Sequence, residues 1–151
     1  MRKEIGTVIC TSDGPSAGNF SFVVTQENDE IPIRRGQFVE METAEGKAVA
    51  QVQNIMKTNR YFMRPESVKE YETGRESLNS IFPADRWEYI VAEARPSGIQ
   101  TDIGLKQMTF PTSPGDKVYE ATPDTLSKFL GVDRNGGVNL GKIKYHDLPA
   151  K

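Results

Sequence analysis

The residue types most used in nucleophilic and acid–base catalysis are scarce in this chain, which has one cysteine, Cys10, and one histidine, His146. These counts exclude an internal disulfide, a cysteine-rich zinc site and a multi-histidine metal site. Cys10 follows an apolar run and is expected to be a small buried side chain. His146 is expected at the surface or at a domain junction, and no serine or cysteine stands in a nucleophile-elbow sequence. We therefore predict no catalytic residue and no metal ligand.

Phosphate-binding chemistry also has no sequence signal. The chain contains no G-x-x-x-x-G-K-[ST] loop, and its glycines stand singly or in pairs at turn positions. No other set of residues is suited to cradle the β- and γ-phosphates of ATP. We expect no cofactor and no ATPase activity from this chain.

Basic and acidic residues are nearly balanced, with 19 Lys and Arg against 21 Asp and Glu among 151 residues, for a formal charge of −2. Proteins that bind nucleic acid by neutralising phosphates are usually basic, so this balance argues against a free-standing binder of that kind. A local basic cluster lies beside Tyr61 and Phe62 and consists of Lys57, Arg60 and Arg64. It is either a contact to DNA or a neighbouring subunit, or it forms ion pairs with nearby glutamates.

Two further pairs of residues have both a structural and a functional interpretation. Trp87 and Tyr89 share one face of a predicted strand. They either fill the core or form a platform on which single-stranded nucleic acid stacks. Arg34 and Arg35 precede Gly36 and form either a solvated turn or a contact to a partner.

Four large apolar residues lie in a stretch of ambiguous structure, residues 99–110. They are Ile99, Ile103, Met108 and Phe110. If the stretch is exposed, they are the first candidates for a partner-docking surface, because exposed apolar clusters mark interfaces. If the stretch is a pair of strands, they belong to the core.

Short alternating runs separated by Gly and Pro predict most of the chain to be strands. The runs cover residues 5–9, 20–25, 37–43, 48–55, 87–95, 117–121 and 138–145, with turns at 44–47 and 95–98. Phe38 and Met41 are three residues apart and therefore lie on opposite faces of their strand, so both faces should be covered. Helices are expected over residues 65–79, after Pro65, and from Pro123 to residue 130, with Thr122 as N-cap and Gly131 as the stop.

The predicted fold is a single mainly-β domain, residues 1–151, built as a small closed barrel. It has six or seven strands and one or two helical insertions. The sequence begins without the apolar stretch of a signal peptide, and no apolar run approaches about 18 residues. A cytoplasmic location is therefore expected.

An ordered set of short segments carries a family resemblance. The segments are IGTVI at 5–9, GQFVE at 36–40, NRYF at 59–62, WEY at 87–89, AEARPSG at 92–98, PGD at 114–116, FLG at 129–131 and HDLP at 146–149. In this order they resemble the N-terminal barrel (HAS-barrel) of HerA-type hexameric DNA-translocase ATPases, over nearly the whole chain. No single segment is diagnostic, and the order gives the resemblance its specificity.

The resemblance implies a barrel similar to that at the N-terminus of rotary ATP synthase catalytic subunits. In the family the chain continues into a RecA-type motor core, which holds the phosphate loop. The barrel ring supports subunit association and docks a NurA-type nuclease that resects DNA ends in recombinational repair, mainly in archaea. The expected role is thus a non-catalytic assembly and docking domain that meets DNA only indirectly and self-associates weakly or not at all.

Two other functions suit a small barrel. One is a module that binds single-stranded nucleic acid. The other is a flavin-binding reductase-like barrel, which GQFV at 36–39 also resembles. Against flavin, residues 60–62 depart from the Arg-x-Tyr-Ser/Thr element of that family, and no dinucleotide fingerprint follows.

Overall fold

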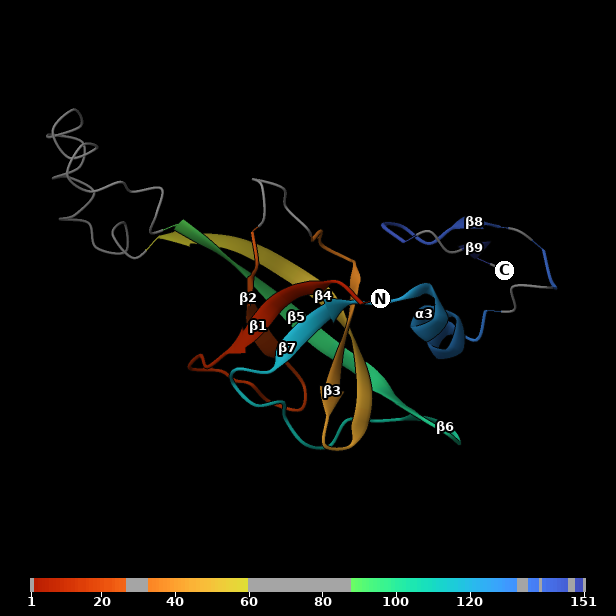
Figure 1. The fold of residues 1–151 in the computed structure, drawn as a ribbon, viewed down its shortest axis with the longest axis horizontal. Helices are drawn as coiled ribbons and strands as arrows, with labels where there is room; N and C mark the ends of the chain where they lie inside the picture. The colour runs from red at the N-terminus through yellow and green to blue at the C-terminus, as the bar shows by residue number, and fades with distance from the viewer. Residues whose placement is uncertain are drawn as a thin grey trace, which may run out of the picture.

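A computed structural model describes residues 2–26, 33–59, 88–132, 136–138, 140–146 and 149–150. Six antiparallel strands close into a barrel with the ring order β1-β7-β3-β4-β5-β2 (Figure 1). The ring strands are β1 (Glu4–Ile9), β2 (Phe20–Val24), β3 (Phe38–Thr43), β4 (Gly46–Asn59), β5 (Glu88–Thr101) and β7 (Lys117–Glu120). The strand β6 (Gly104–Lys106) pairs with the end of β5 outside the ring, and β8 (Gly141–Lys142) pairs with β9 (Pro149–Ala150). The predicted closed, mainly-β barrel is confirmed.

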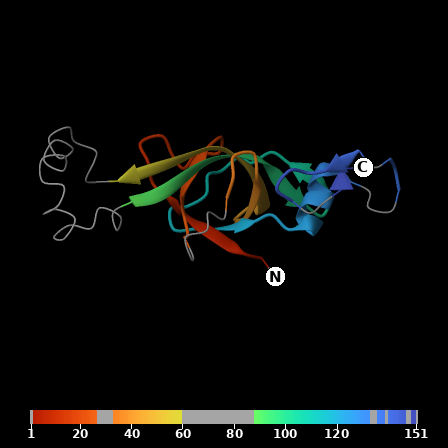
Figure 2. The same ribbon diagram turned by 90° about the horizontal axis from the view of Figure 1, so that it is seen from above.

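The ring closes through β2, which pairs with β1 on one edge and β5 on the other. Phe22 stands opposite Val8 in the first pairing and opposite Ala92 in the second. The longest pairing joins β4 to β5, from Lys47 opposite Gln100 to Asn59 opposite Glu88. These two strands run on beyond the barrel as a two-stranded ribbon (Figure 2).

Apolar side chains from every ring strand fill the barrel. The alternation of strand side chains directs one face of each strand inward, where burial of apolar surface stabilises the fold. The largest core side chains include Phe20, Phe22, Ile5, Met41, Ile90 and Ile99. Phe20 and Phe22 share a face of β2, with their ring centroids 6.1 Å apart.

The helix α3 (Pro123–Leu130) packs on the outside of the barrel, and it begins and ends where the sequence predicts. Thr122 is the N-cap, its side chain accepting a hydrogen bond from Thr125 N–H, and Gly131 ends the helix with a φ of 65°. Leu126 is fully buried, and Phe38 of β3 packs against the small cluster that it forms. Both faces of β3 are therefore covered, as expected. Within the described part of the chain, no helix has the length and apolar character needed to cross a membrane.

Two expected elements differ from the structure. The prediction of a turn at residues 95–98 is wrong, because β5 continues through them. The register shifts where Val49 and Ala50 of β4 face Gly98 and Pro96, which leaves Ser97 as the extra residue of a bulge. A bulge tolerates a proline that has no N–H to donate. The strand expected at 138–145 is limited to β8, and the helix expected at 65–79 lies outside the described residues.

Candidate functional site

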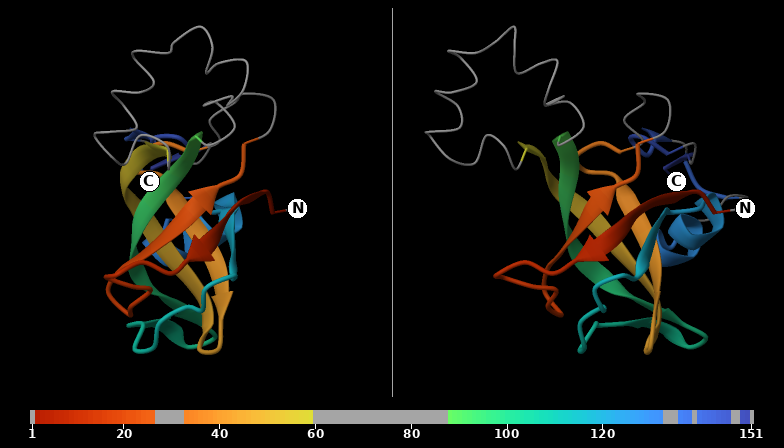
Figure 3. Two further views of the ribbon diagram at one scale, coloured as in Figure 1. Left: turned by 90° about the vertical axis from the view of Figure 1, so that its left-hand side faces the viewer. Right: turned by 60° about the vertical axis from the view of Figure 1, so that its left-hand side comes forward.

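The β3–β4 turn and the β5–β6 hairpin lie at the same end of the barrel, which we call the hairpin end (Figure 3). Both turns close in the same way. Thr43 Oγ1 donates to the Gly46 carbonyl, Thr101 Oγ1 donates to the Gly104 carbonyl, and each distance is 2.7 Å. The two glycines have φ values of 134° and 131°, which side chains with a Cβ rarely adopt. The hairpin end is thus built from two similar, closed turns.

Glu45 in the β3–β4 turn holds the segment that follows β6. Its Oε1 accepts the N–H groups of Thr109 at 3.1 Å and Phe110 at 2.9 Å, and its Oε2 accepts Thr109 Oγ1 at 3.0 Å. Lys106 Nζ lies 3.2 Å from the same Oε2. Burial raises the pKa of Glu45, but Lys106 and the hydrogen bonds from Thr109 and Phe110 outweigh that effect, so the pKa is lowered. The charged carboxylate therefore ties residues 106–110 to the β3–β4 turn.

Three large apolar side chains are exposed at the hairpin end. Ile103 is 100% exposed, Phe110 66% and Leu105 55%. Ile99 and Met108 are buried in the barrel core, at 0% and 5%. Of the four docking candidates that the sequence suggests, Ile103 and Phe110 are therefore exposed at this end. The structure adds Leu105 to them. Exposed apolar side chains of this size are typical of protein interfaces.

Arg34 and Arg35 lie elsewhere, in the turn before β3. Gln37 N–H donates to the Arg34 carbonyl at 3.1 Å, and Arg34 N–H donates to Gln37 Oε1 at 3.0 Å. Both arginines are exposed. The six residues of β3 separate this turn from the hairpin end by roughly 20 Å. The two arginines do not share a surface with Ile103 and Phe110.

Of the candidate basic cluster, only Lys57 lies among the described residues, on the β4–β5 ribbon. Lys57 Nζ lies 3.2 Å from Glu88 Oε1, so this lysine forms an ion pair. Tyr89 is 38% exposed, so of its two interpretations the place in the core is wrong. Its neighbour Ile90 faces inward, and alternation turns Tyr89 outward. The remaining candidates lie outside the described residues, namely Arg60, Arg64 and Trp87.

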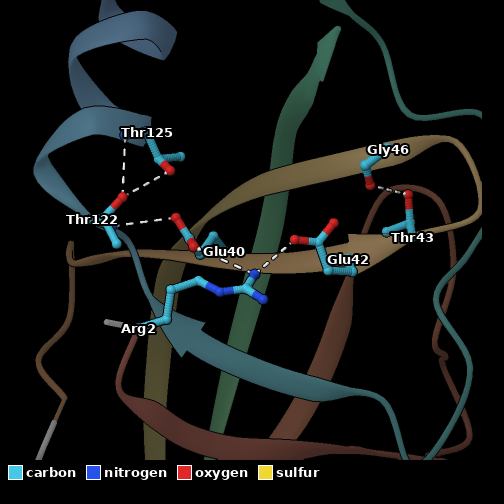
Figure 4. Close-up of polar contacts among 7 residues, drawn as sticks. All are labelled: Arg2, Glu40, Glu42, Thr43, Gly46, Thr122 and Thr125. Atoms are coloured by element: carbon cyan, nitrogen blue, oxygen red, sulfur yellow. Dashed lines mark hydrogen bonds and ion pairs between the residues drawn. The ribbon is translucent and has the colours of Figure 1, made fainter.

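Glu40 is a buried carboxylate on the outside of the barrel (Figure 4). Its Oε2 accepts the Thr122 N–H at 3.3 Å, and its Oε1 lies 3.6 Å from Arg2 Nη1. The same Arg2 nitrogen donates to Glu42 Oε1 at 2.7 Å, and the guanidinium lies 4.4 Å from the ring centre of Tyr119. Glu40 thus joins β3 to the residues before β1 and to the start of α3.

His146 is only 9% exposed, so of its two expected positions, the surface or a domain junction, the surface is wrong. Its Nε2 accepts the Phe38 N–H at 3.0 Å, and the two rings lie 5.9 Å apart. Burial lowers the pKa of His146, and the Glu120 carboxylate opposes this by raising it. His146 borders a cleft of about 250 Å³, whose other lining residues are Lys3, Glu120, Ala121, Thr122, Pro123 and Tyr145.

Side chains of the metal-ligating types are not gathered into one cluster in the described part of the chain. Among the described residues, no group of three His, Cys, Asp or Glu side chains is placed to hold a metal ion. Cys10 is exposed, which corrects its expected burial, because it lies just beyond the end of β1. His146 lines its cleft together with Lys3, which lies at the other end of β1. The length of this strand places Cys10 roughly 20 Å along the backbone from Lys3. Cys10 and His146 cannot act as a nucleophile–base pair in this arrangement.

Sequence patterns did not identify three residues of the sites described above, namely Glu40, Glu45 and Leu105. Glu40 is buried by a segment 82 residues further along the chain, which no local pattern reveals. Glu45 stands in a turn that was predicted, but its partners are 64 and 65 residues away. Leu105 follows Ile103 at a spacing of two, and that alternation was the one available signal.

Comparison with protein-family models finds none that matches this chain, and a search of curated proteins finds no match. The proposals below therefore rest on the geometry described above and on the resemblance in the sequence.

Proposed function

We propose that this chain is a non-catalytic assembly and partner-docking domain of a HerA-like DNA-translocating ATPase, which acts with a NurA-type nuclease in DNA end resection. The ordered segments of the sequence support this proposal, and the closed barrel is the fold that the resemblance implies. The proposal assigns no catalytic residue to the chain. Purified chain incubated with ATP should release no phosphate above the buffer blank, and turnover would contradict the proposal.

The observation that carries the docking role is the set of exposed apolar side chains at the hairpin end. Ile103, Leu105 and Phe110 all lie on a frame fixed by closed turns and by Glu45. Burying apolar surface stabilises a complex by about 25 cal/mol per Å² before the costs of association. A surface that is already ordered loses little conformational entropy on binding, so these side chains suit an anchor for a partner.

Binding of the NurA-type nuclease tests this assignment by titration calorimetry. The double variant Ile103→Asp and Phe110→Asp should bind at least about thirtyfold more weakly, which corresponds to loss of about 2 kcal/mol from hot-spot side chains. Leu140→Asp is the matched control, because Leu140 is an apolar side chain 82% exposed in the C-terminal part of the chain. Unchanged binding by the double variant, or an equal loss in the control, would exclude the hairpin end as the docking site.

Neighbouring subunits of a hexameric ring are the second proposed partner. In the family resemblance the motor core supplies much of the ring interface, so this chain alone should be monomeric at micromolar concentration. Light scattering measures this directly, and a hexamer would overturn the expectation.

A nucleic-acid-binding function has one observation in its favour, namely the exposed side chains on the β4–β5 ribbon. Tyr89 offers an exposed ring, and Lys57 lies on the adjacent strand with its side chain 64% exposed. Base stacking on such a ring contributes about 1–3 kcal/mol per base. Binding of a labelled single strand that weakens steeply with salt would favour this function, and no binding at low salt would exclude it.

A further inference from the structure

We propose that His146 is a pH-sensitive latch between β3 and the C-terminal segment, residues 141–146. The latch lies at the opposite end of β3 from the hairpin end, so it is independent of the docking proposal. Its ring accepts the first N–H of β3, that of Phe38, at 3.0 Å, and it packs on the Phe38 side chain. Ile143, three residues earlier, packs against the cluster formed by Leu126 of α3.

The hydrogen bond requires a neutral imidazole. Nε2 accepts the Phe38 N–H, so Nε2 carries a lone pair and the proton of the neutral ring resides on Nδ1. Protonation places a hydrogen on Nε2, where it faces the Phe38 N–H. Two donors then oppose each other, and a charged ring is held at 9% exposure. Both effects favour release of His146 from the barrel.

Burial and one charged group act on the ring in opposite directions. Burial lowers the pKa of His146, and Glu120, at the end of β7, offsets part of that effect by raising it. Lys3, before β1, and Tyr145, on the same segment, line the cleft with His146. Lys144 stacks over the ring of Tyr145, 5.0 Å from its centre. The parts of β3 and α3 in contact with this site contribute Phe38, Thr122 and Pro123, none of which titrates.

The direction of the pH effect follows from the lowered pKa. The released imidazole binds a proton near its ordinary pKa of about 6.5, and the latched imidazole binds one only at lower pH. The latch is therefore fully closed above about pH 6.5 and weakens as the pH falls toward the lowered pKa. Below that pKa both forms are protonated, and no further weakening occurs.

Amide hydrogen exchange at Phe38, measured by NMR from pH 7.5 to 5, tests the latch. After correction for intrinsic exchange, the opening equilibrium at Phe38 should rise by up to about tenfold per pH unit below about 6.5. His146 is the one histidine of the chain, so its ring signals report the titration without ambiguity. The Val8 N–H, which donates to Asp116 O inside the barrel wall, is the internal reference and should not follow the histidine.

Two variants separate the latch from general acid sensitivity. His146→Gln retains an acceptor that does not titrate, so the pH dependence at Phe38 should disappear. Glu120→Gln removes the group that raises the pKa of His146, so the ring should titrate at lower pH. The opening equilibrium at Phe38 should then reach its plateau at lower pH, and the plateau should be higher than in the wild type. Glu4→Gln, which removes a surface carboxylate 3.1 Å from Lys117, should change neither quantity.

Three results would overturn the proposal. The first is Phe38 exchange that does not change as His146 titrates. The second is a His146→Gln variant that keeps the wild-type pH dependence. The third is a Glu120→Gln variant in which both the His146 titration and the opening equilibrium at Phe38 are unchanged. This result decides if the His146→Gln variant does not fold.

Discussion

The carboxylate of Glu40 on β3 accepts a hydrogen bond from the backbone N–H of Thr122, the N-cap of α3, at 3.3 Å (Figure 4). The glutamate is fully buried on the outer face of the barrel, where it also lies 3.6 Å from Arg2 Nη1. This contact attaches the C-terminal helix to the barrel through a polar group and not only through Leu126 and Phe38.

We expect Glu40→Ala to lower the free energy of unfolding by roughly 1–3 kcal/mol, because the Thr122 N–H loses its acceptor and Arg2 loses a buried anion. Urea unfolding followed by circular dichroism measures the change. Glu42→Ala is a matched control, since Glu42 also binds Arg2 but has 57% of its side chain exposed. Its effect should stay below about 0.5 kcal/mol. Equal losses in the two variants would mean that the buried contact of Glu40 stabilises the fold no more than the exposed contact of Glu42.

A second prediction concerns close packing between β1 and β2. A Cβ added at Gly6 would overlap the carbonyl oxygen of Val23 and lie 2.5 Å from Phe22 Cδ2. The first of these atoms belongs to the backbone of the partner strand and cannot move alone. Gly6→Ala should therefore lower the free energy of unfolding by about 1–3 kcal/mol or more. Gly18→Ala, where no atom lies within 4 Å of the new carbon, should be close to neutral in the same urea titration. A Gly6→Ala protein as stable as the wild type would show that β1 and β2 can separate at little cost.

A third prediction follows from the lowered pKa of Glu45. Its charged form holds the N–H groups of Thr109 and Phe110, so both amides should be protected from exchange above pH 4.5, the ordinary value for this group. Because the pKa is lowered in the folded chain, this protection should fall as the pH drops below 4.5 and through the lowered pKa. Hydrogen exchange read by mass spectrometry over residues 106–110 measures it.

Glu45→Gln removes that titration. The variant should show weaker protection of Thr109 and Phe110 at neutral pH and little further change in acid. Glu4→Gln serves as the control, because it removes a surface carboxylate that binds only Lys117 among the described residues. If Glu45→Gln leaves the exchange of residues 106–110 unchanged at pH 7, the carboxylate does not order this segment.

The sequence was sufficient to predict the elements whose causes are local. Alternation and turn residues gave the strands on either side of the β3–β4 turn, and Thr122 and Gly131 gave both ends of α3. Opposite parity of Phe38 and Met41 indicated that β3 is covered on both faces, as it is. In each case neighbours within a few residues determine the outcome.

The errors arose where distant segments decide. Pro96 reads as a turn residue, yet β4 shifts register opposite it and accommodates the proline in β5. Cys10 is exposed and not buried, because it lies beyond the end of β1. His146 is not at the surface, because the distant Phe38 packs against its ring. Ile103 and Ile99 are equally apolar, but the two-residue turn exposes the first and the ring buries the second.

The last prediction separates the cap of α3 from its attachment to the barrel. Thr122 Oγ1 accepts the N–H of Thr125 at 3.3 Å, while its own backbone N–H donates to Glu40. Thr122→Ala removes the first bond and the one that Thr122 Oγ1 donates to Thr125 Oγ1 at 3.0 Å, but it leaves the Glu40 contact in place. It should therefore lower the free energy of unfolding by about 1 kcal/mol. Thr122→Ser keeps a hydroxyl at the same position and should restore most of the loss. Urea unfolding gives the free energies, and amide exchange at Thr125 reports the cap itself. A Thr122→Ala protein with wild-type exchange at Thr125 would show that Glu40 and the packing of Leu126, and not the cap, determine where α3 begins.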